Sequence, residues 1–155
     1  MELRKQVCSL ELAKKLRELD VKQESLFYWM EMYDLSRKEK YIDSKNETKV
    51  VYGKKYELGE NCSNNDFSAF TVAELGEMLP QKVEKHQPGK MEYYYFGTGK
   101  THKLDEYYEE HEVSYSCHND SLKAEEILQI MRANTEADAR AKMIVYLLEK
   151  KLLKP

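Results

Sequence analysis

Residues 91–117 read MEYYYFGTGKTHKLDEYYEEHEVSYSC, and this stretch decides the fold class. Met91 to Phe96 is rich in tyrosine and predicts a strand, and Val113 to Cys117 alternates apolar and polar residues as a half-buried strand does. Gly97-Thr98-Gly99 predicts a turn after the first strand. Strands that follow one another with no helix between them favour an antiparallel sheet.

Helical patterns precede these strands. Ser9 is placed as the N-cap of a helix with apolar residues at helical spacing, and Asp20 ends it, because Asp tolerates a left-handed backbone. A second helix begins at Thr71, where Thr71-Val-Ala-Glu74 fits a capping box, and it stops at Pro80.

Helical patterns also follow the strands. Ser121 to Met131 predicts a short helix, and Thr135 is placed as the cap of a last helix. Small residues in the first half of that last helix suggest a close approach to another element. Between the second helix and Met91, residues 81–90 predict a polar connector with a turn at Pro88-Gly89.

The N-terminal part adds further strands. Leu26 to Tyr33 is aromatic and short, which predicts a buried strand. Val50 to Leu58 predicts a hairpin with Gly53-Lys54 as its two-residue turn, and residues 34–48 and 59–66 predict loops. Together the patterns predict an α+β fold, with an antiparallel sheet of about four to six strands packed by three or four helices in a single compact layer pair. The length predicts one domain over residues 1–155.

Composition narrows the functional classes. The 155 residues carry 25 Lys and Arg against 28 Asp and Glu, a net charge of −3, and the linear sequence holds no basic patch, which disfavours nucleic acid as a partner. The longest apolar run, residues 143–148, is too short to span a bilayer, and the start of the chain has no secretory signal. Cys8, Cys62 and Cys117 are odd in number and widely spaced, unlike a disulfide framework. We therefore expect a cytoplasmic protein without membrane association.

Three blocks carry a family resemblance: SLELAKKLRELDVKQES at 9–25, FTVAELGEMLP at 70–80 and TEADARAKMIVYLLE at 135–149. In this order they resemble a family of short uncharacterised proteins encoded by bacteriophages and prophages, and the middle of the chain is not part of the likeness. One departure is Asp20, where members of the family usually carry Gly. The resemblance implies the cytoplasm of a bacterial host. It brings no established activity and no catalytic residues.

Two motif fragments point to catalysis and are incomplete. The stretch from Gly97 to Thr101 looks like the tail of a phosphate-binding loop, but Tyr94 stands where that pattern needs Gly, and an acidic segment follows. His111-Glu112 looks like the start of a zinc-protease motif, but Tyr115 stands where the second His must be. We therefore predict no catalytic residues and no cofactor.

A zinc site is the other chemical hypothesis. Its candidate ligands are His102, His111, Cys117 and His118. Adjacent Cys117 and His118 point to opposite faces of a strand, so the sequence favours surface histidines and a half-buried thiol over a metal site. A small hydrolase or metalloenzyme stays open as an alternative.

The segment 9–33 hints at a helix-turn-helix. A DNA reader needs a second helix that presents basic side chains to the major groove, whereas only Lys22 is basic between Val21 and Met32. A DNA-binding regulator using residues 9–33 is therefore a second alternative.

Tyrosine clustering supplies the leading hypothesis. The chain has 12 tyrosines, and three consecutive ones place rings on both faces of a strand, so at least one ring is expected at the surface. Tyrosine is enriched at protein interfaces, although filling of the sheet is the simpler use. We predict a non-enzymatic module that binds a host or phage protein, with self-association also open. The candidate partner surface comprises Tyr93, Tyr94, Tyr95, Tyr107, Tyr108, Asp105 and Glu106.

Overall fold

The computed structural model describes residues 3–32, 47–52, 67–87, 90–102, 109–119 and 124–155. The strands form two antiparallel sheets, one with the order β2-β1-β3 and one with the order β4-β5-β6-β7. The predicted α+β class with antiparallel pairing is confirmed. In chain order the elements are η1 (Leu3–Lys5), α1 (Leu10–Glu18), β1 (Phe27–Met32), β2 (Glu47–Tyr52), β3 (Phe67–Ser68), α2 (Val72–Met78), β4 (Lys82–Gln87), β5 (Lys90–His102), β6 (Glu109–Asn119), β7 (Ala124–Ala133) and α3 (Glu136–Glu149).

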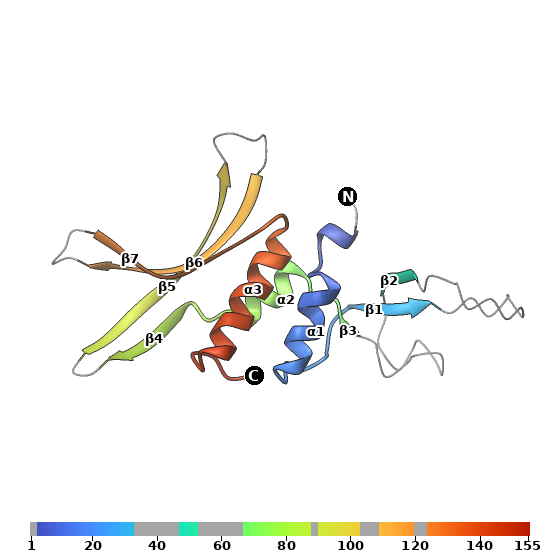
Figure 1. Cartoon of the computed structure of the whole chain (residues 1–155), viewed down its shortest axis with the longest axis horizontal. Helices are drawn as coiled ribbons and strands as arrows, with labels where there is room; N and C mark the ends of the chain where they lie inside the picture. The colour runs from blue at the N-terminus through green and yellow to red at the C-terminus, as the bar shows by residue number, and fades with distance from the viewer. Residues whose placement is uncertain (1–2, 33–46, 53–66, 88–89, 103–108, 120–123) are drawn as a thin grey trace, which may run out of the picture.

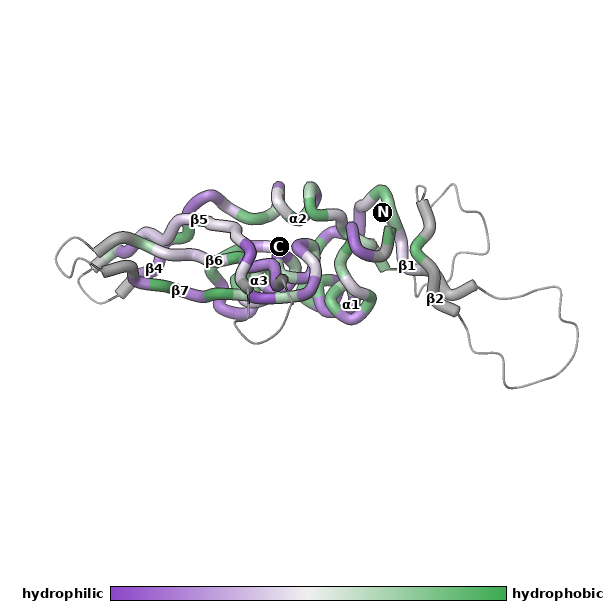
Figure 2. Tube along the Cα trace, turned by 90° about the horizontal axis from the view of Figure 1, so that it is seen from above, coloured by the Kyte–Doolittle hydropathy of each residue, from purple (hydrophilic) through white to green (hydrophobic). Residues whose placement is uncertain are grey.

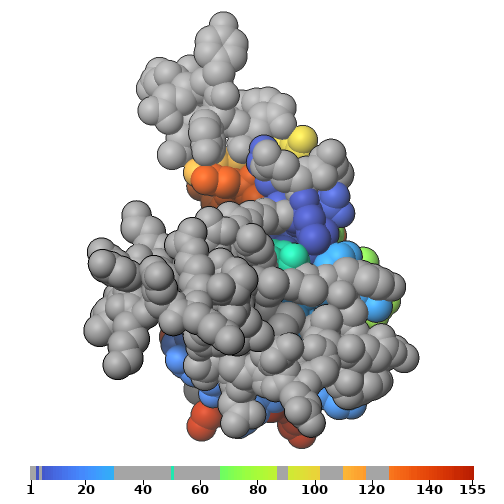
Figure 3. Space-filling model, turned by 90° about the vertical axis from the view of Figure 1, so that its right-hand side faces the viewer, coloured from blue at the N-terminus to red at the C-terminus, as the bar shows by residue number. Residues whose placement is uncertain are grey.

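The three α-helices lie between the two sheets (Figure 1). The four-stranded sheet extends to one side of α3 and the small sheet to the far side of α1, an order that is also visible from above (Figure 2). Residues from the two ends of the chain are neighbours, because α1 packs on α3. Seen from the end that carries β1, blue N-terminal residues adjoin orange residues that precede α3 (Figure 3).

Local capping explains where the helices begin and end. Thr71 and Glu74 form the predicted capping box, in which each side chain accepts a hydrogen bond from the backbone N–H of the other residue. Thr135 caps α3 by accepting from the Asp138 amide, and Asp20 has a φ of 61°, the left-handed conformation predicted after α1. Ser9 is the N-cap of α1 by position, but its side chain makes no capping hydrogen bond.

Two strands of the small sheet overlap strands predicted in the N-terminal part: β1 lies within residues 26–33, and β2 overlaps the start of residues 50–58. β1 pairs with β2 on one side, with Trp29 opposite Val50, and with β3 on the other. Strand β2 begins at Glu47, so the last two residues of the predicted 34–48 loop belong to a strand. The predicted Gly53-Lys54 turn and the 59–66 loop lie outside the described residues.

The predicted connector over residues 81–90 is wrong, because Lys82–Gln87 forms β4. This strand lies at the edge of the sheet and buries Val83 between the exposed residues Lys82 and Glu84. Edge strands commonly carry charged side chains, which discourage unwanted pairing with other chains, and only alternate residues of β4 face the core. Its composition therefore resembled that of a loop.

The predicted turn at Gly97-Thr98-Gly99 is also wrong, because β5 continues through it to His102. A Cβ on Gly97 would lie 3.3 Å from Ser114 Oγ, and a Cβ on Gly99 would meet nothing within 4 Å. Both glycines are paired within the β5–β6 ladder, Gly97 with Ser114 and Gly99 with Glu112, where the two long strands bend (Figure 1).

The predicted helix over residues 121–131 is the third correction, since Ala124–Ala133 forms β7. A β-bulge interrupts the β6–β7 ladder between Tyr115 and Ser116, so that Ser116 pairs with Ile127 while Tyr115 pairs with Gln129. The extra residue, Leu128, interrupts the alternation of side chains between the two faces of β7. Apolar residues of β7 therefore fell at intervals that also fit a helix.

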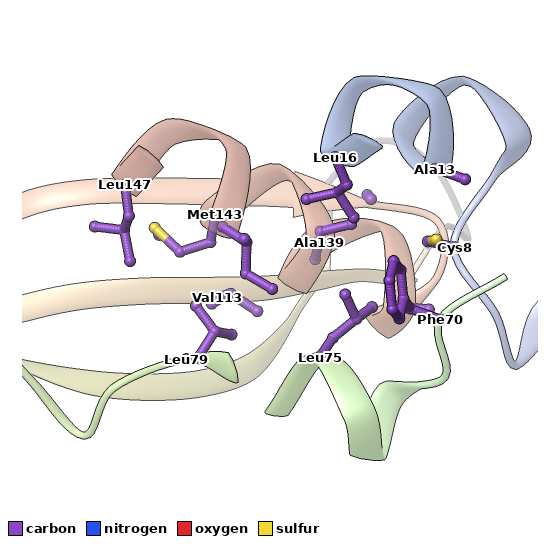
Figure 4. Packing of buried hydrophobic residues seen from close by; sticks show 14 of the residues in the cluster. Cys8, Ala13, Leu16, Phe70, Leu75, Leu79, Val113, Ala139, Met143 and Leu147 are labelled. Carbon is purple, nitrogen blue, oxygen red and sulfur yellow. The ribbon is translucent and has the colours of Figure 1, made fainter. Parts of the chain in front are cut away.

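One hydrophobic core joins the helices to both sheets. Its largest fully buried side chains include Leu16 of α1, Leu75 of α2, Met143 and Leu147 of α3, and Phe70. These side chains face one another in the interior (Figure 4). The first half of α3 contributes buried alanines, which allow the close approach predicted from its small residues: Ala137, Ala139 and Ala141. The three blocks of the family resemblance thus supply much of this core.

Candidate functional site

The tyrosine-rich start of β5 divides its side chains between the two faces of the four-stranded sheet. Met91, Tyr93 and Tyr95 are 46%, 39% and 59% exposed, whereas Tyr94 is fully buried. Alternation along a strand requires this division. The prediction that at least one of the consecutive rings lies at the surface is confirmed.

The strand register brings a fourth apolar side chain to the exposed face. Tyr95 pairs with Ser116 of β6, and Ser116 pairs with Ile127 of β7, which is 49% exposed. Residues directly opposite one another in a sheet project to the same side. We call the surface formed by Met91, Tyr93, Tyr95 and Ile127 the outer face.

Polar contacts hold the tyrosine end of the outer face in place. The Lys82 ammonium of β4 lies 4.2 Å from the centroid of the Tyr93 ring, and the Tyr93 hydroxyl donates to the Met91 sulfur at 2.9 Å. Lys82 also forms an ion pair with Glu84 at 3.4 Å. The two charges nearest these rings are therefore balanced.

The opposite face holds Tyr94 in a hydrogen-bonded group. Its hydroxyl lies 2.8 Å from Glu92 Oε2 and 2.9 Å from Glu126 Oε1, and its one proton serves one carboxylate at a time. Burial raises the pKa of Tyr94 above its ordinary value, and the two carboxylates raise it further. Tyr94 therefore remains protonated and structural. No pattern in the sequence indicated Glu92 or Glu126.

Tyr115 has a comparable structural role on β6. It is fully buried, packs on Phe96 with ring centroids 5.7 Å apart, and donates to the Pro80 carbonyl. Burial raises its pKa above the ordinary value. These contacts join β6 to the end of α2, so the ring fills the sheet and is not available to a partner.

The remaining predicted surface residues lie outside the described residues: Asp105, Glu106, Tyr107 and Tyr108. Of the predicted set, the described residues are Tyr93 and Tyr95 at the surface and Tyr94 in the interior. Met91 and Ile127 were not among the residues that the sequence patterns indicate. Met91 could have been found from its spacing to Tyr93 and Tyr95, whereas Ile127 had been assigned to a helix.

The candidate zinc ligands are spread along the sheet. His111 and Cys117 lie on β6 six residues apart, about 20 Å at the rise of a strand. Within the part of the chain that the structure describes, no group of three or more His, Cys, Asp or Glu residues is placed to hold a metal ion. The phosphate-loop fragment at Gly97 to Thr101 lies within strand β5, and the next element that the structure describes after it is another strand, β6, rather than a helix that could present free amides.

The segment proposed for DNA reading contains one helix, α1, followed by the strand β1. A helix-turn-helix requires two helices, so the described residues of 9–32 do not form one. No helix in the described ranges has the length and apolar character that a bilayer crossing requires.

Comparisons with known proteins add no assignment. No protein-family model, curated protein or solved structure matches this chain.

Proposed function

We propose that this protein is a non-enzymatic binding module and that the outer face is where it contacts a host or phage protein. The observation that carries the proposal is the exposure of four large apolar side chains on one face of one sheet: Met91, Tyr93, Tyr95 and Ile127. Scattered exposed apolar residues are common on protein surfaces, whereas a group on one face marks an interaction site.

The chemistry of the outer face suits a protein partner. Tyrosine and methionine are enriched at protein interfaces, and tyrosine supplies a large contact area with only two side-chain torsions to immobilise. The Lys82 and Glu84 charges beside the rings pair with each other, and the chain as a whole has a net charge of −3. A surface of this kind offers little attraction to nucleic acid phosphates. The resemblance to phage and prophage proteins supports a partner from the host or the phage.

The test compares three forms of the tagged protein in a bacterial lysate. Proteins captured by the wild type are identified, purified and titrated against the wild type, a Tyr93→Ser/Tyr95→Ser variant and a Leu26→Ser control. Leu26 is a matched control because it is 56% exposed and precedes β1, away from the four-stranded sheet.

The proposal predicts that the double variant weakens the purified complex by about tenfold or more, as the loss of interface aromatics does. The Leu26→Ser variant should bind like the wild type. Equal binding by all three forms would contradict the proposal, as would a lysate from which the wild type captures nothing beyond the tag alone.

A further inference from the structure

The two edge strands of the four-stranded sheet differ in whether their outward backbone N–H and C=O groups have hydrogen-bond partners. The strand order leaves β4 at one edge and β7 at the other. In antiparallel pairs, every second residue of an edge strand directs its N–H and C=O away from the neighbour. Each edge can therefore accept another strand unless side chains or bulges block it.

The β7 edge is blocked. The Ile130 carbonyl accepts from Gln129 Nε2 at 3.1 Å, and the Arg132 carbonyl accepts from Lys142 Nζ at 2.8 Å. Ile130 and Arg132 form non-hydrogen-bonded pairs with residues of β6. Their carbonyls therefore point away from β6, toward the open side of β7. The β-bulge beside Ser116 adds a second obstacle to a straight partner strand.

The β4 edge is open. The Phe96 amide donates to the Gln81 carbonyl, which sets the alternation along β4 and directs the N–H and C=O of Lys82, Glu84 and His86 away from β5. Among the described residues, these outward groups have no hydrogen-bond partner. In Figure 1 no other labelled element runs along this side of β4.

The side chains of β4 select the strand that fits there. Lys82 and Glu84 carry opposite charges and lie on the same side of the sheet as the outer face. Within one chain, Lys82 Nζ is 3.4 Å from Glu84 Oε1. In an antiparallel pair of two β4 strands centred on Val83, Lys82 stands opposite Glu84 of the second copy, and Glu84 stands opposite Lys82 of the second copy. In both pairs the N–H and C=O of each residue point away from β5, so the two residues of each pair can exchange two backbone hydrogen bonds. Opposite charges at directly opposed positions stabilise such a pair.

We propose that two copies of this chain associate through antiparallel pairing of their β4 strands, with a two-fold axis at Val83. The four charges then alternate in sign around the axis, and the two sheets become one continuous sheet. Both outer faces lie on the same side of that sheet. The proposal does not depend on the proposed function, because the pairing uses the backbone edge and the Lys82 and Glu84 side chains.

Charge reversal tests the register. Lys82→Glu places Glu opposite Glu twice, and Glu84→Lys places Lys opposite Lys twice, so each single variant should raise the dimer dissociation constant by about tenfold or more. The double variant Lys82→Glu/Glu84→Lys should restore the dimer. A mixture of the two single variants should form heterodimers, because each supplies the charges that the other needs.

The measurement is sedimentation equilibrium of the full chain, with circular dichroism to verify folding of each variant. Matched controls are Lys22→Glu and Glu24→Lys. These residues are likewise two positions apart in the sequence and form an exposed ion pair, with Nζ 2.8 Å from Oε1, outside the strands that the structure describes. The wild type and both controls should approach twice the monomer mass of 18.4 kDa as concentration rises. A wild type that stays monomeric would overturn the proposal. So would a dimer that survives both single β4 variants, because that dimer would use another surface.

Discussion

Asp138, in the first turn of α3, accepts a hydrogen bond at Oδ1 from the backbone amide of Ser9 at 2.7 Å. The two residues are 129 positions apart, and the bond joins the N-cap of the first helix to the start of the last. Ser9 makes no side-chain cap for its own helix, while Asp138 also donates its amide to the Thr135 hydroxyl oxygen. One carboxylate therefore connects the two ends of the chain.

Replacement of Asp138 by Ala should lower the free energy of unfolding by about 1–2 kcal/mol, since the Ser9 amide loses its acceptor. Asp138→Asn keeps an acceptor oxygen and should cost less. Urea denaturation of both variants measures the difference. Equal losses for Ala and Asn would show that the charge of Asp138 matters more than this hydrogen bond.

Glu74 provides a second long-range connection. Besides completing the capping box, its carboxylate accepts from the Ser25 hydroxyl and the Leu26 amide, both at 3.0 Å. Glu74→Ala removes these acceptors together and should lower the free energy of unfolding by about 2–3 kcal/mol. Glu77→Ala, at an exposed position of the same helix, is the control and should change it by less than about 0.5 kcal/mol. Similar losses in the two variants would contradict this role for Glu74.

Gly76 allows α2 to approach α3. A Cβ at this position would lie 2.3 Å from Nη1 of Arg140, whose guanidinium pairs with Glu136 at 2.6 Å and lies over the Phe96 ring. The guanidinium is the end of a flexible side chain and can move, so Gly76→Ala should destabilise the protein by at most about 1 kcal/mol, because Arg140 must leave these contacts.

The sign of the Gly76 effect should reverse in an Arg140→Ala background. With the guanidinium absent, the better helix propensity of Ala should stabilise the protein by up to about 1 kcal/mol. A double-mutant cycle by chemical denaturation measures the coupling. Additive effects of the two substitutions would show that the Gly76–Arg140 contact does not limit the packing.

The burial of the Cys8 thiol predicts that the protein loses stability in alkaline solution. Its thiol is fully buried, and burial raises its pKa from 9.0 to about 12. Between these values the unfolded chain releases a proton that the folded chain retains, so the free energy of unfolding falls by up to about 1.4 kcal/mol for each pH unit above 9. Below pH 9 this contribution is fully present.

Denaturation at pH 8, 9 and 10 checks this, with Cys8→Ala as the comparison. The wild type should lose more stability between pH 8 and pH 10 than the variant, which lacks the buried Cys8 thiol. Parallel curves for the two proteins would contradict the assignment.

What the sequence predicted well depends on residues close to one another in the chain. The capping box at Thr71 and Glu74, the Thr135 cap and the left-handed Asp20 each involve at most a few consecutive positions, and local chemistry defines them. Alternation along β5 likewise predicted that the consecutive tyrosines would divide between two faces.

The errors arose where pairing with a distant strand decides the structure. The bulge opposite Tyr115 shifts the period of β7, which converted a strand into an apparent helix and concealed Ile127. The polar composition of β4 is acceptable only because β5 supplies its hydrogen bonds. The bond between Ser9 and Asp138 has no local signal at all.

Site-specific photo-crosslinking measures directly whether the outer face contacts another protein. A benzoylphenylalanine placed at Tyr95, or at Leu26 as the control, is irradiated in bacterial cells that express the full chain. Both positions are more than half exposed, so the label reaches solvent equally at each. We predict a covalent adduct with a discrete protein, other than a second copy of this chain, from position 95 and not from position 26. The absence of an adduct at 95, or the same adduct from both positions, would contradict the account.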